Sequence, residues 1–237
     1  MMSKYETVKT PAGIANRFLH PFTMTIVGQT MSGKSQLIKE ILTFRQQLFT
    51  TAFDRIFYCT PSLQFYHNQG YLNELKKICP QIVLIENEPS QSLIRGSQQS
   101  LFILDDLMSK IFDNRHFEEL FTQSSHHMSN SVIYTSQNYF NTKRDQTIVR
   151  NLSYQIIFYR NADLRYMRNV SGQFSTDPKF FKKCFDLLEQ EESPKELYKK
   201  FILIDNHPQN PFSKFPVRGM IMPRSDGVIR PLMFPCE

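Results

Sequence analysis

The fold is decided by Met24-Thr-Ile-Val-Gly-Gln-Thr-Met-Ser-Gly-Lys-Ser-Gln-Leu-Ile-Lys39, which contains the pattern G-x-x-x-x-G-K-[ST] from Gly28 to Ser35. An apolar, β-branched run precedes the pattern and a run with helical periodicity follows it. A strand, a tight turn and a helix N-terminus in this order form the context that a phosphate-binding loop requires. The stretch therefore predicts an α/β fold of the P-loop class that binds a nucleoside triphosphate.

Each part of this loop has an expected role. The backbone N–H groups would wrap a phosphate, and the helix that begins near Gly33 adds the positive end of its dipole. Lys34 would reach the β- and γ-phosphates, and the Ser35 hydroxyl would bind Mg²⁺, so ATP and Mg²⁺ are the expected cofactors. The residues expected to hold the nucleotide are Gly28, Gln29, Thr30, Met31, Ser32, Gly33, Lys34, Ser35 and Gln36.

A second part of the site is predicted where Leu101-Phe-Ile-Leu104 is followed by two carboxylates, Asp105 and Asp106. Four apolar residues before two acids are typical of a buried parallel strand that delivers acids to a ligand crevice. We expect Asp105 to hold Mg²⁺ through water and Asp106 to orient the attacking water. Alone, the pattern also fits a strand ending in two solvated acids; the phosphate-binding loop favours the site.

The stretch Ser131–Asn138 reads as a further strand that ends in polar groups. Gln137 could there contact the γ-phosphate or position water, although Gln137 and Asn138 also suit a simple turn. Whole strands inserted between the loop and the acids favour the RecA-like (ASCE) branch, with a mostly parallel sheet flanked by helices. The Asn-Lys-x-Asp motif expected of a GTPase is missing from the sequence.

Periodicity predicts the remaining elements. The tract Ser90–Ser100 reads as a loop or a poor helix. We expect three parts: an N-terminal arm (1–20), the ATPase domain (21–206) and a proline-rich C-terminal extension (207–237). The expected strands are Thr23–Val27, Arg55–Cys59, Ile82–Ile85, Tyr154–Tyr159, Phe201–Ile204 and Met220–Met222, and the expected helices are one that ends near Phe44, Tyr71–Ile78, Ile111–Phe121 and Asp177–Leu188.

Composition narrows the class of protein. The 237 residues suit one α/β domain, and no stretch approaches the apolar run of a membrane span. The four cysteines are scattered, which favours a reducing intracellular compartment over a zinc or disulfide framework. A metal site at His126-His127 is disfavoured because adjacent side chains point apart and no third ligand is evident.

Charge is unevenly distributed along the chain. The net charge is +6 and the isoelectric point about 9.1, and most of the positive excess follows residue 138. Such a cluster suits a polyanion read through its phosphates, but composition fits an ordinary solvated face equally well. The clustered cations are Lys143, Arg144, Arg150, Arg160, Arg165 and Arg168.

Several segments together resemble the viral genome-packaging ATPases of the FtsK–HerA superfamily. The resemblance is to the short, single-domain versions from polinton/adintovirus-like elements, distant relatives of the poxvirus packaging ATPase, and covers most of residues 17–205. The segments that carry it are Arg17-Phe-Leu-His-Pro-Phe-Thr-Met-Thr-Ile-Val-Gly28, Leu101–Met108, Leu120-Phe-Thr-Gln-Ser-Ser-His-His127, Ser131–Asn138 and Ile148-Val-Arg-Asn-Leu-Ser-Tyr-Gln-Ile-Ile-Phe-Tyr-Arg-Asn161.

This resemblance implies an ATP-driven motor that assembles as a homo-oligomeric ring and pumps double-stranded DNA of any sequence into a preformed capsid. It implies a viral capsid or portal component as partner and a place inside the infected host cell, with nucleus, cytoplasm and association with the virion left open. Gly28–Ser35 would be the Walker A loop, Asp105 and Asp106 the Walker B acids, and Gln137 the polar sensor.

The sequence departs from the family pattern at two positions. Asp106 stands where the family more often has Glu, and Met128 stands where an arginine would reach into the neighbouring subunit's site. An arginine finger is worth several orders of magnitude in rate. Arg115, Arg144 or Arg150 could replace it, and we name Arg150 as the expected catalytic arginine.

Two other functions stay open at this stage. A small-molecule P-loop kinase would explain Arg160–Arg168 as a lid segment. A nucleotide-gated assembly protein with weak hydrolysis would explain the missing arginine.

Overall fold

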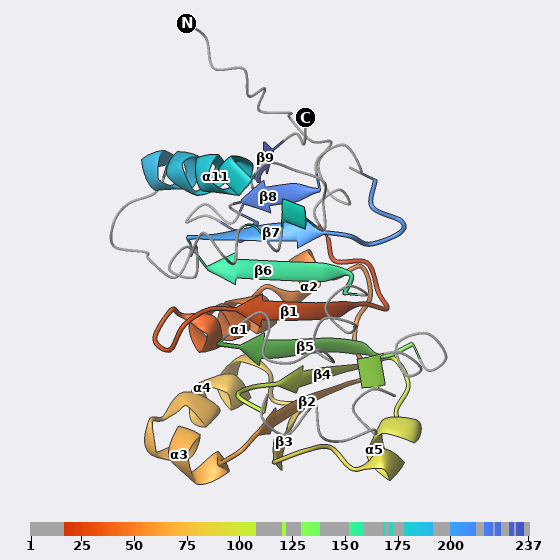
Figure 1. The fold of residues 1–237 in the computed structure, drawn as a ribbon. Coiled ribbons are helices and arrows are strands. Elements are labelled where there is room, and N and C mark those ends of the chain that lie inside the picture. The colour runs from red at the N-terminus through yellow and green to blue at the C-terminus, as the bar shows by residue number, and fades with distance from the viewer. Residues whose placement is uncertain are drawn as a thin grey trace, which may run out of the picture.

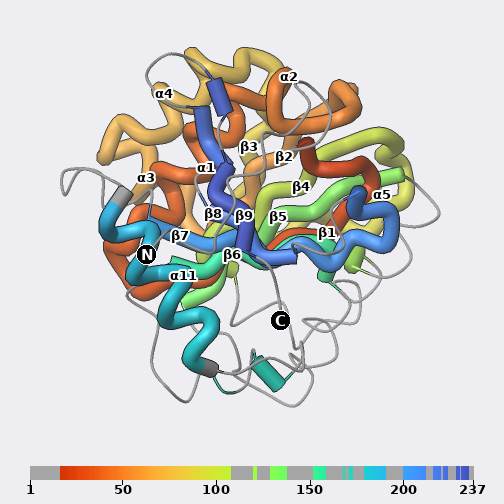
Figure 2. The backbone as a smooth tube through the Cα atoms, turned by 90° about the horizontal axis from the view of Figure 1, so that it is seen from above, coloured from red at the N-terminus to blue at the C-terminus, as the bar shows by residue number. Residues whose placement is uncertain are grey.

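The computed structural model describes residues 17–107, 120–121, 129–137, 152–158, 168, 171–172, 178–191, 200–211, 216–219, 221–223, 228–229 and 231–234. In these residues a single nine-stranded sheet runs through the molecule, and helices lie on both of its faces (Figures 1 and 2). The architecture is therefore a three-layer α/β/α arrangement.

The sheet has the order β3-β2-β4-β5-β1-β6-β7-β8-β9. From β3 to β6 every neighbouring pair is parallel, whereas β7, β8 and β9 add antiparallel strands at one edge. The strands are β1 (Thr23–Val27), β2 (Arg55–Thr60), β3 (Ile82–Glu86), β4 (Ser100–Leu104), β5 (Ser131–Ser136), β6 (Tyr154–Phe158), β7 (Phe201–Asp205), β8 (Val217–Gly219) and β9 (Leu232–Phe234).

The central strands are apolar almost throughout because both faces of the sheet are covered. All five residues of β1 are buried, and so are all residues of β4, β5 and β6. A parallel strand covered on both faces loses the alternation of apolar and polar residues that a half-exposed strand shows. This explains the continuous apolar runs in the sequence.

The helices divide between the two faces. On one face α1 (Lys34–Thr43) and α4 (Tyr71–Ile78) share a core with β1, β2 and β4, to which α1 contributes Leu37, Ile38, Ile41 and Leu42. On the other face α11 (Pro178–Glu191) buries Phe181, Phe185 and Leu188 (Figure 2). Three shorter helices complete the described set: α2 (Arg45–Leu48), α3 (Leu63–Asn68) and α5 (Gln91–Arg95).

The strand order identifies the branch of the P-loop class. β1, which leads into the G-x-x-x-x-G-K-[ST] loop, is separated from β4, which leads into Asp105, by the inserted strand β5. This is the RecA-like order, so the α/β, RecA-like fold expected from the sequence is confirmed. Because the strands are parallel, the loops after β1, β4 and β5 all emerge at one edge of the sheet.

Most predicted elements within the described residues are confirmed, with boundaries shifted by a few residues. The helix expected over Asp177–Leu188 spans Pro178–Glu191, and the tract Ser90–Ser100 holds the short helix α5 and the first residue of β4. The helices α2 and α3 were not predicted. The helix expected over Ile111–Phe121 lies, except for its last two residues, outside the described residues.

The strand expected at Met220–Met222 is wrong. The tail instead forms β8 over Val217–Gly219 and β9 over Leu232–Phe234, while Ile221 and Met222 are buried without belonging to a strand. The apolar pattern misplaced the strand because β8 contains a buried arginine, Arg218, which forms an ion pair with Asp205 of β7.

The described chain begins beside the core. Phe18 forms an isolated parallel bridge with Phe49 and is 2% exposed. At the other end, β8 and β9 extend the same sheet that β1 begins. The division at residues 20 and 206 stays a prediction.

Candidate nucleotide-binding site

The loop after β1 has the backbone that its sequence predicts. The Gly28 N–H donates to the Ser136 carbonyl at 2.9 Å, so the loop leaves the sheet beside the end of β5. A Cβ atom at Gly28 would lie 2.2 Å from Ser32 Oγ and 3.1 Å from Phe158 Cδ2, so any larger residue there would displace the Ser32 side chain. Met31 and Gly33 both have positive φ, 64° and 102°. Left-handed residues inside such a turn create the concave array of N–H groups that binds anions.

Helix α1 begins without a side-chain cap. Its N-cap residue is Gly33, which has no side chain to accept a hydrogen bond from the first turn. The first N–H groups of a helix have no partner within the helix, and the helix dipole favours negative charge at this end. A phosphate group is the ligand that this arrangement suits.

Lys34 lies over the loop. Its Nζ donates to the Gly28 carbonyl at 2.6 Å and to the Gln29 carbonyl at 3.1 Å, and the residue is only 9% exposed. Burial lowers the pKa of Lys34, while Asp106 and Asp105 act in the opposite direction. The lysine and the two acids therefore form one electrostatic unit, although they come from separate segments of the chain.

Asp105 lies at the end of β4 and is 2% exposed. Its carboxylate accepts two hydrogen bonds: Oδ2 from the Tyr58 hydroxyl and Oδ1 from the Thr135 hydroxyl, the latter at 2.8 Å. Burial raises the pKa of Asp105, and the hydrogen bonds from Tyr58 and Thr135 oppose this rise. A carboxylate has about four acceptor positions in all, so these two hydrogen bonds do not use its full capacity.

Asp106 differs from its neighbour in both exposure and backbone. Its side chain is exposed, and its φ is 59°, in the left-handed region. The Asp106 N–H donates to Thr135 Oγ1 at 3.0 Å, so the one threonine hydroxyl joins the backbone of Asp106 to the carboxylate of Asp105. Left-handed non-glycine residues are often found at functional sites, and aspartate tolerates this conformation better than most.

The structure brings most of the predicted site residues to one edge of the sheet. The loop 28–35, Asp105 and Asp106 meet there, and Gln137 directly follows the Ser136 whose carbonyl accepts from Gly28. The predicted roles of these residues stay predictions. The residues proposed for the trans arginine, Arg115, Arg144 and Arg150, lie outside the described residues, as do Met128 and His126-His127.

The residues present fit Mg²⁺ in the way that this ion is usually held. Within the described part of the chain, no three His, Cys, Asp or Glu side chains gather as a metal-binding group. Mg²⁺ is commonly bound by one or two carboxylates together with substrate phosphates and waters. Asp105 and Ser35 would supply the protein's part of such a shell.

The sequence interpretation missed Tyr58, Thr135 and Tyr71. Tyr58 and Thr135 are fully buried and bind the Asp105 carboxylate, and the Tyr71 hydroxyl donates to the Ser35 carbonyl at 2.8 Å. Tyr58 and Thr135 belong to strands whose sequences predict core positions, and a hydroxyl in such a strand does not by itself indicate a functional site. In the structure the register pairs Ile103 with Ile133, which places Asp105 and Thr135 on the same face of the sheet, and the sequence alone does not contain this pairing.

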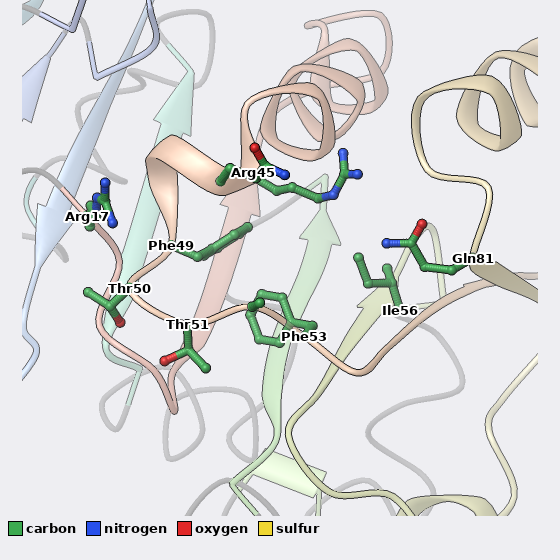
Figure 3. Close-up of a pocket in the computed structure, with 10 residues that line it drawn as sticks. Arg17, Arg45, Phe49, Thr50, Thr51, Phe53, Ile56 and Gln81 are labelled. Atoms are coloured by element: carbon green, nitrogen blue, oxygen red, sulfur yellow. The ribbon is translucent and has the colours of Figure 1, made fainter.

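A cavity of about 290 Å³ lies near the start of β2 (Figure 3), and its lining contains none of the predicted site residues. Phe49 and Phe53 line this cavity together with Arg17 and Arg45. Arg45 Nη1 donates to the carbonyls of Leu42 and Ile78, near the C-termini of α1 and α4. Its charge therefore has a structural role, since cations stabilise helix C-termini.

Together, the loop, the uncapped helix and the acids at the end of β4 define the P-loop NTPase fold of the RecA-like branch. No family model and no curated protein matches the chain. Among the helices of the described residues, none has the length and apolar character needed to cross a membrane.

Two solved structures are similar to the chain at low identity. The genome packaging NTPase B204 from Sulfolobus turreted icosahedral virus 2, in complex with ATP-gammaS, is 15% identical with a TM-score of 0.47, covering 78% of this chain and 91% of that chain. The flagellar accessory protein FlaH from Methanocaldococcus jannaschii is 16% identical with a TM-score of 0.41, covering 58% and 71%. Similarity this remote carries no information on activity or partners.

Proposed function

We propose that this chain is a Mg²⁺-dependent ATP hydrolase that acts as a double-stranded DNA translocase and packages a viral genome into a capsid as a homo-oligomeric ring. The observation that supports hydrolysis best is the meeting of Lys34 with Asp105 and Asp106 at the edge where the loop and the uncapped α1 lie. The capsid or portal partner and the place in the infected cell belong to the same proposal and rest on the resemblance of the sequence.

The chain's own residues suit phosphoryl transfer to water. The loop N–H groups and the Lys34 ammonium bind the phosphates and offset the charge that develops on the bridging oxygen. Bound Mg²⁺ supplies further charge neutralisation. The exposed Asp106 carboxylate accepts a hydrogen bond from the attacking water and orients it. An arginine from the neighbouring subunit, for which Arg150 is the candidate, completes the site.

The DNA part of the proposal rests on charge and on the resemblance of the sequence to packaging ATPases. The net charge is +6, and most of the excess lies after residue 138. A motor that grips any sequence must bind phosphates rather than bases. Its affinity for DNA must then fall as the salt concentration rises, because the counterions that binding releases from the duplex gain less entropy in a more concentrated solution.

The test is steady-state ATP hydrolysis by the full chain, with and without long double-stranded DNA, at low and moderate salt. We expect salt-sensitive stimulation by DNA of any sequence. Turnover that requires a soluble small-molecule acceptor and ignores DNA would show a kinase instead. Tight ATP binding that drives oligomerisation with no stimulated hydrolysis would show a nucleotide-gated assembly protein.

Lys34→Ala provides the matched control. Hydrogen bonds to a charged partner contribute about 1.5–3 kcal/mol each, so loss of the ammonium should weaken ATP binding about 100-fold. Fluorescence titration with a labelled ATP analogue measures the change. Residual hydrolysis in Lys34→Ala equal to that of the wild type would assign the activity to a contaminant.

A further inference from the structure

Three tyrosines from the segment between β1 and β3 form a closed cluster beside the nucleotide site. The ring centroids of Tyr58 and Tyr66 are 6.3 Å apart, those of Tyr58 and Tyr71 6.0 Å, and those of Tyr66 and Tyr71 5.7 Å. Tyr58 belongs to β2, Tyr66 to α3 and Tyr71 to α4. Residues outside the phosphate-binding loop and the acid pair therefore pack against one another at the site.

Two of these tyrosines donate hydrogen bonds to residues that are expected to bind Mg²⁺. The Tyr58 hydroxyl donates to Asp105 Oδ2, and the Tyr71 hydroxyl donates to the Ser35 carbonyl at 2.8 Å. Asp105 lies at the end of β4, whereas Ser35 lies in the first turn of α1. The cluster thus bridges the two parts of the chain whose separation sets the size of the metal site.

The hydrogen bond from Tyr58 constrains the carboxylate in a way that packing alone does not. Thr135 holds Oδ1, and Tyr58 holds Oδ2, so rotation of the carboxylate would break at least one bond to a buried charged acceptor. Hydrogen bonds to charged groups are stronger than hydrogen bonds between neutral groups. The remaining acceptor positions of Asp105 are then held in one orientation before any metal arrives.

We propose that Tyr58 and Tyr71 are positioning residues of the Mg²⁺–nucleotide site, through which β2 and α4 fix Asp105 and the first turn of α1 relative to each other. This inference rests on the proposed binding of Mg²⁺ and ATP. The hydroxyls contact Asp105 and the Ser35 carbonyl, and the role assigned to them is to hold these groups rather than to bind the nucleotide. Loss of either one acts on the metal through the residue that it holds.

The alternative is that the tyrosines only fill the core. Replacement by phenylalanine separates the two roles, because it keeps the ring and removes only the hydroxyl. A packing role predicts unchanged metal binding in Tyr58→Phe, whereas a positioning role predicts weaker metal binding. Groups that orient metal ligands typically contribute about 10–100-fold to metal affinity.

The experiment measures binding of a fluorescent ATP analogue by the full-length wild type, Tyr58→Phe and Tyr71→Phe, first in EDTA and then as Mg²⁺ is added. We expect the affinity in EDTA to stay within about twofold of the wild type, since the loop and Lys34 are intact. The Mg²⁺ concentration for half-maximal enhancement should rise about tenfold or more in Tyr58→Phe and less in Tyr71→Phe, where the contact is to a backbone carbonyl.

Tyr154→Phe is the matched control. Tyr154 is also a buried tyrosine of the sheet, and its hydroxyl accepts a hydrogen bond from the Leu19 N–H, away from the nucleotide site. Its Mg²⁺ titration should match that of the wild type. Thermal unfolding of all variants checks that each is folded at the assay temperature; if Tyr58→Phe is not, Tyr71→Phe carries the same test.

The outcomes are distinguishable. An unchanged Mg²⁺ requirement in both phenylalanine variants, with normal binding in EDTA, overturns the positioning role but leaves the proposed function intact. A wild type that binds no nucleotide in either condition overturns the proposed function, and this inference with it. A raised Mg²⁺ requirement in Tyr58→Phe but not in Tyr154→Phe supports both.

Discussion

The parallel and antiparallel parts of the sheet each bury a carboxylate, and they satisfy it in different ways. In the parallel part, Asp105 is 2% exposed and accepts hydrogen bonds from two neutral hydroxyls, those of Tyr58 and Thr135. In the antiparallel part, Asp205 is 5% exposed and forms an ion pair with Arg218, itself 3% exposed.

The difference matters because a buried charge needs compensation. Arg218 neutralises Asp205 directly, so this pair is complete without any ligand. Hydroxyl donors orient the Asp105 carboxylate but leave its negative charge uncompensated, apart from the nearby Lys34. A carboxylate such as Asp105, held only by neutral hydroxyls, is suited to receive a cation. A carboxylate such as Asp205, paired with an arginine, is suited to hold two strands together.

The largest expected effect is a loss of stability when Asp205, the carboxylate of the ion pair, is replaced. Asp205→Asn removes the counter-charge of the buried Arg218 and should lower the free energy of unfolding by about 3–5 kcal/mol. Urea denaturation measures the loss. ATP affinity of the folded protein should not change, because the site residues belong to the parallel strands.

The double variant Asp205→Asn with Arg218→Met sharpens this result. It removes both charges, and replacing a whole buried pair is often neutral in stability. Recovery of most of the lost stability is therefore expected. If Asp205→Asn alone lowers the free energy of unfolding by less than about 1 kcal/mol, Asp205 does not have the structural role that distinguishes it from Asp105.

The next largest effect concerns the exposed acid beside Asp105. Asp106→Asn should reduce ATP hydrolysis about 100-fold or more, because a positioned acid or base typically contributes about 10²–10⁴ to a rate. Asparagine tolerates the left-handed backbone of this residue, with φ of 59°, so folding should be preserved. Single-turnover hydrolysis measures the rate, and nucleotide binding in the same samples serves as the control. Hydrolysis at the wild-type rate would leave Asp106 without the assigned role.

The sequence predicts those parts of the site that are encoded by short local motifs. The loop 28–35 and the pair Asp105-Asp106 are local patterns, and a parallel sheet brings such strand ends together whatever the details of packing. The fold class and the edge of the sheet that carries the site were therefore predictable.

The missed features depend on contacts between distant segments. Tyr58 and Thr135 reach Asp105 only because β2, β4 and β5 are neighbours in the sheet. Arg218 makes its short strand too polar to be predicted as buried, and its burial is explained only by the ion pair with Asp205. Long-range pairings of this kind leave no local pattern, so the tail strand was misplaced for the same reason that the tyrosines were overlooked.

A smaller effect on stability is expected when Asp105, the carboxylate of the nucleotide site, is replaced. Asp105→Asn should raise the free energy of unfolding in metal-free buffer by about 1 kcal/mol, because it removes a buried charge that no strong ion pair offsets. The amide can accept from Thr135 through its oxygen and donate to the Tyr58 hydroxyl, so both hydroxyls keep a partner. Urea denaturation in EDTA measures the change, and Mg²⁺ should no longer enhance ATP binding. A loss of more than about 1 kcal/mol would place Asp105 with Asp205 as a structural carboxylate.

The smallest effect lies in the loop itself, where Met31 combines a left-handed φ of 64° with 93% exposure. The side chain has almost no packing to lose, and the left-handed conformation costs a non-glycine residue about 1–2 kcal/mol. Glycine removes this cost but adds about 0.5–1 kcal/mol of unfolded-state entropy, so Met31→Gly should stabilise the fold by about 0.5 kcal/mol. Gly33→Ala, at φ of 102°, is the matched opposite and should destabilise the loop. Thermal unfolding of the two variants in metal-free buffer, with ATP affinity measured alongside, tests whether the loop keeps this backbone before the nucleotide binds. Destabilisation by Met31→Gly would show that the loop adopts it only with ligand.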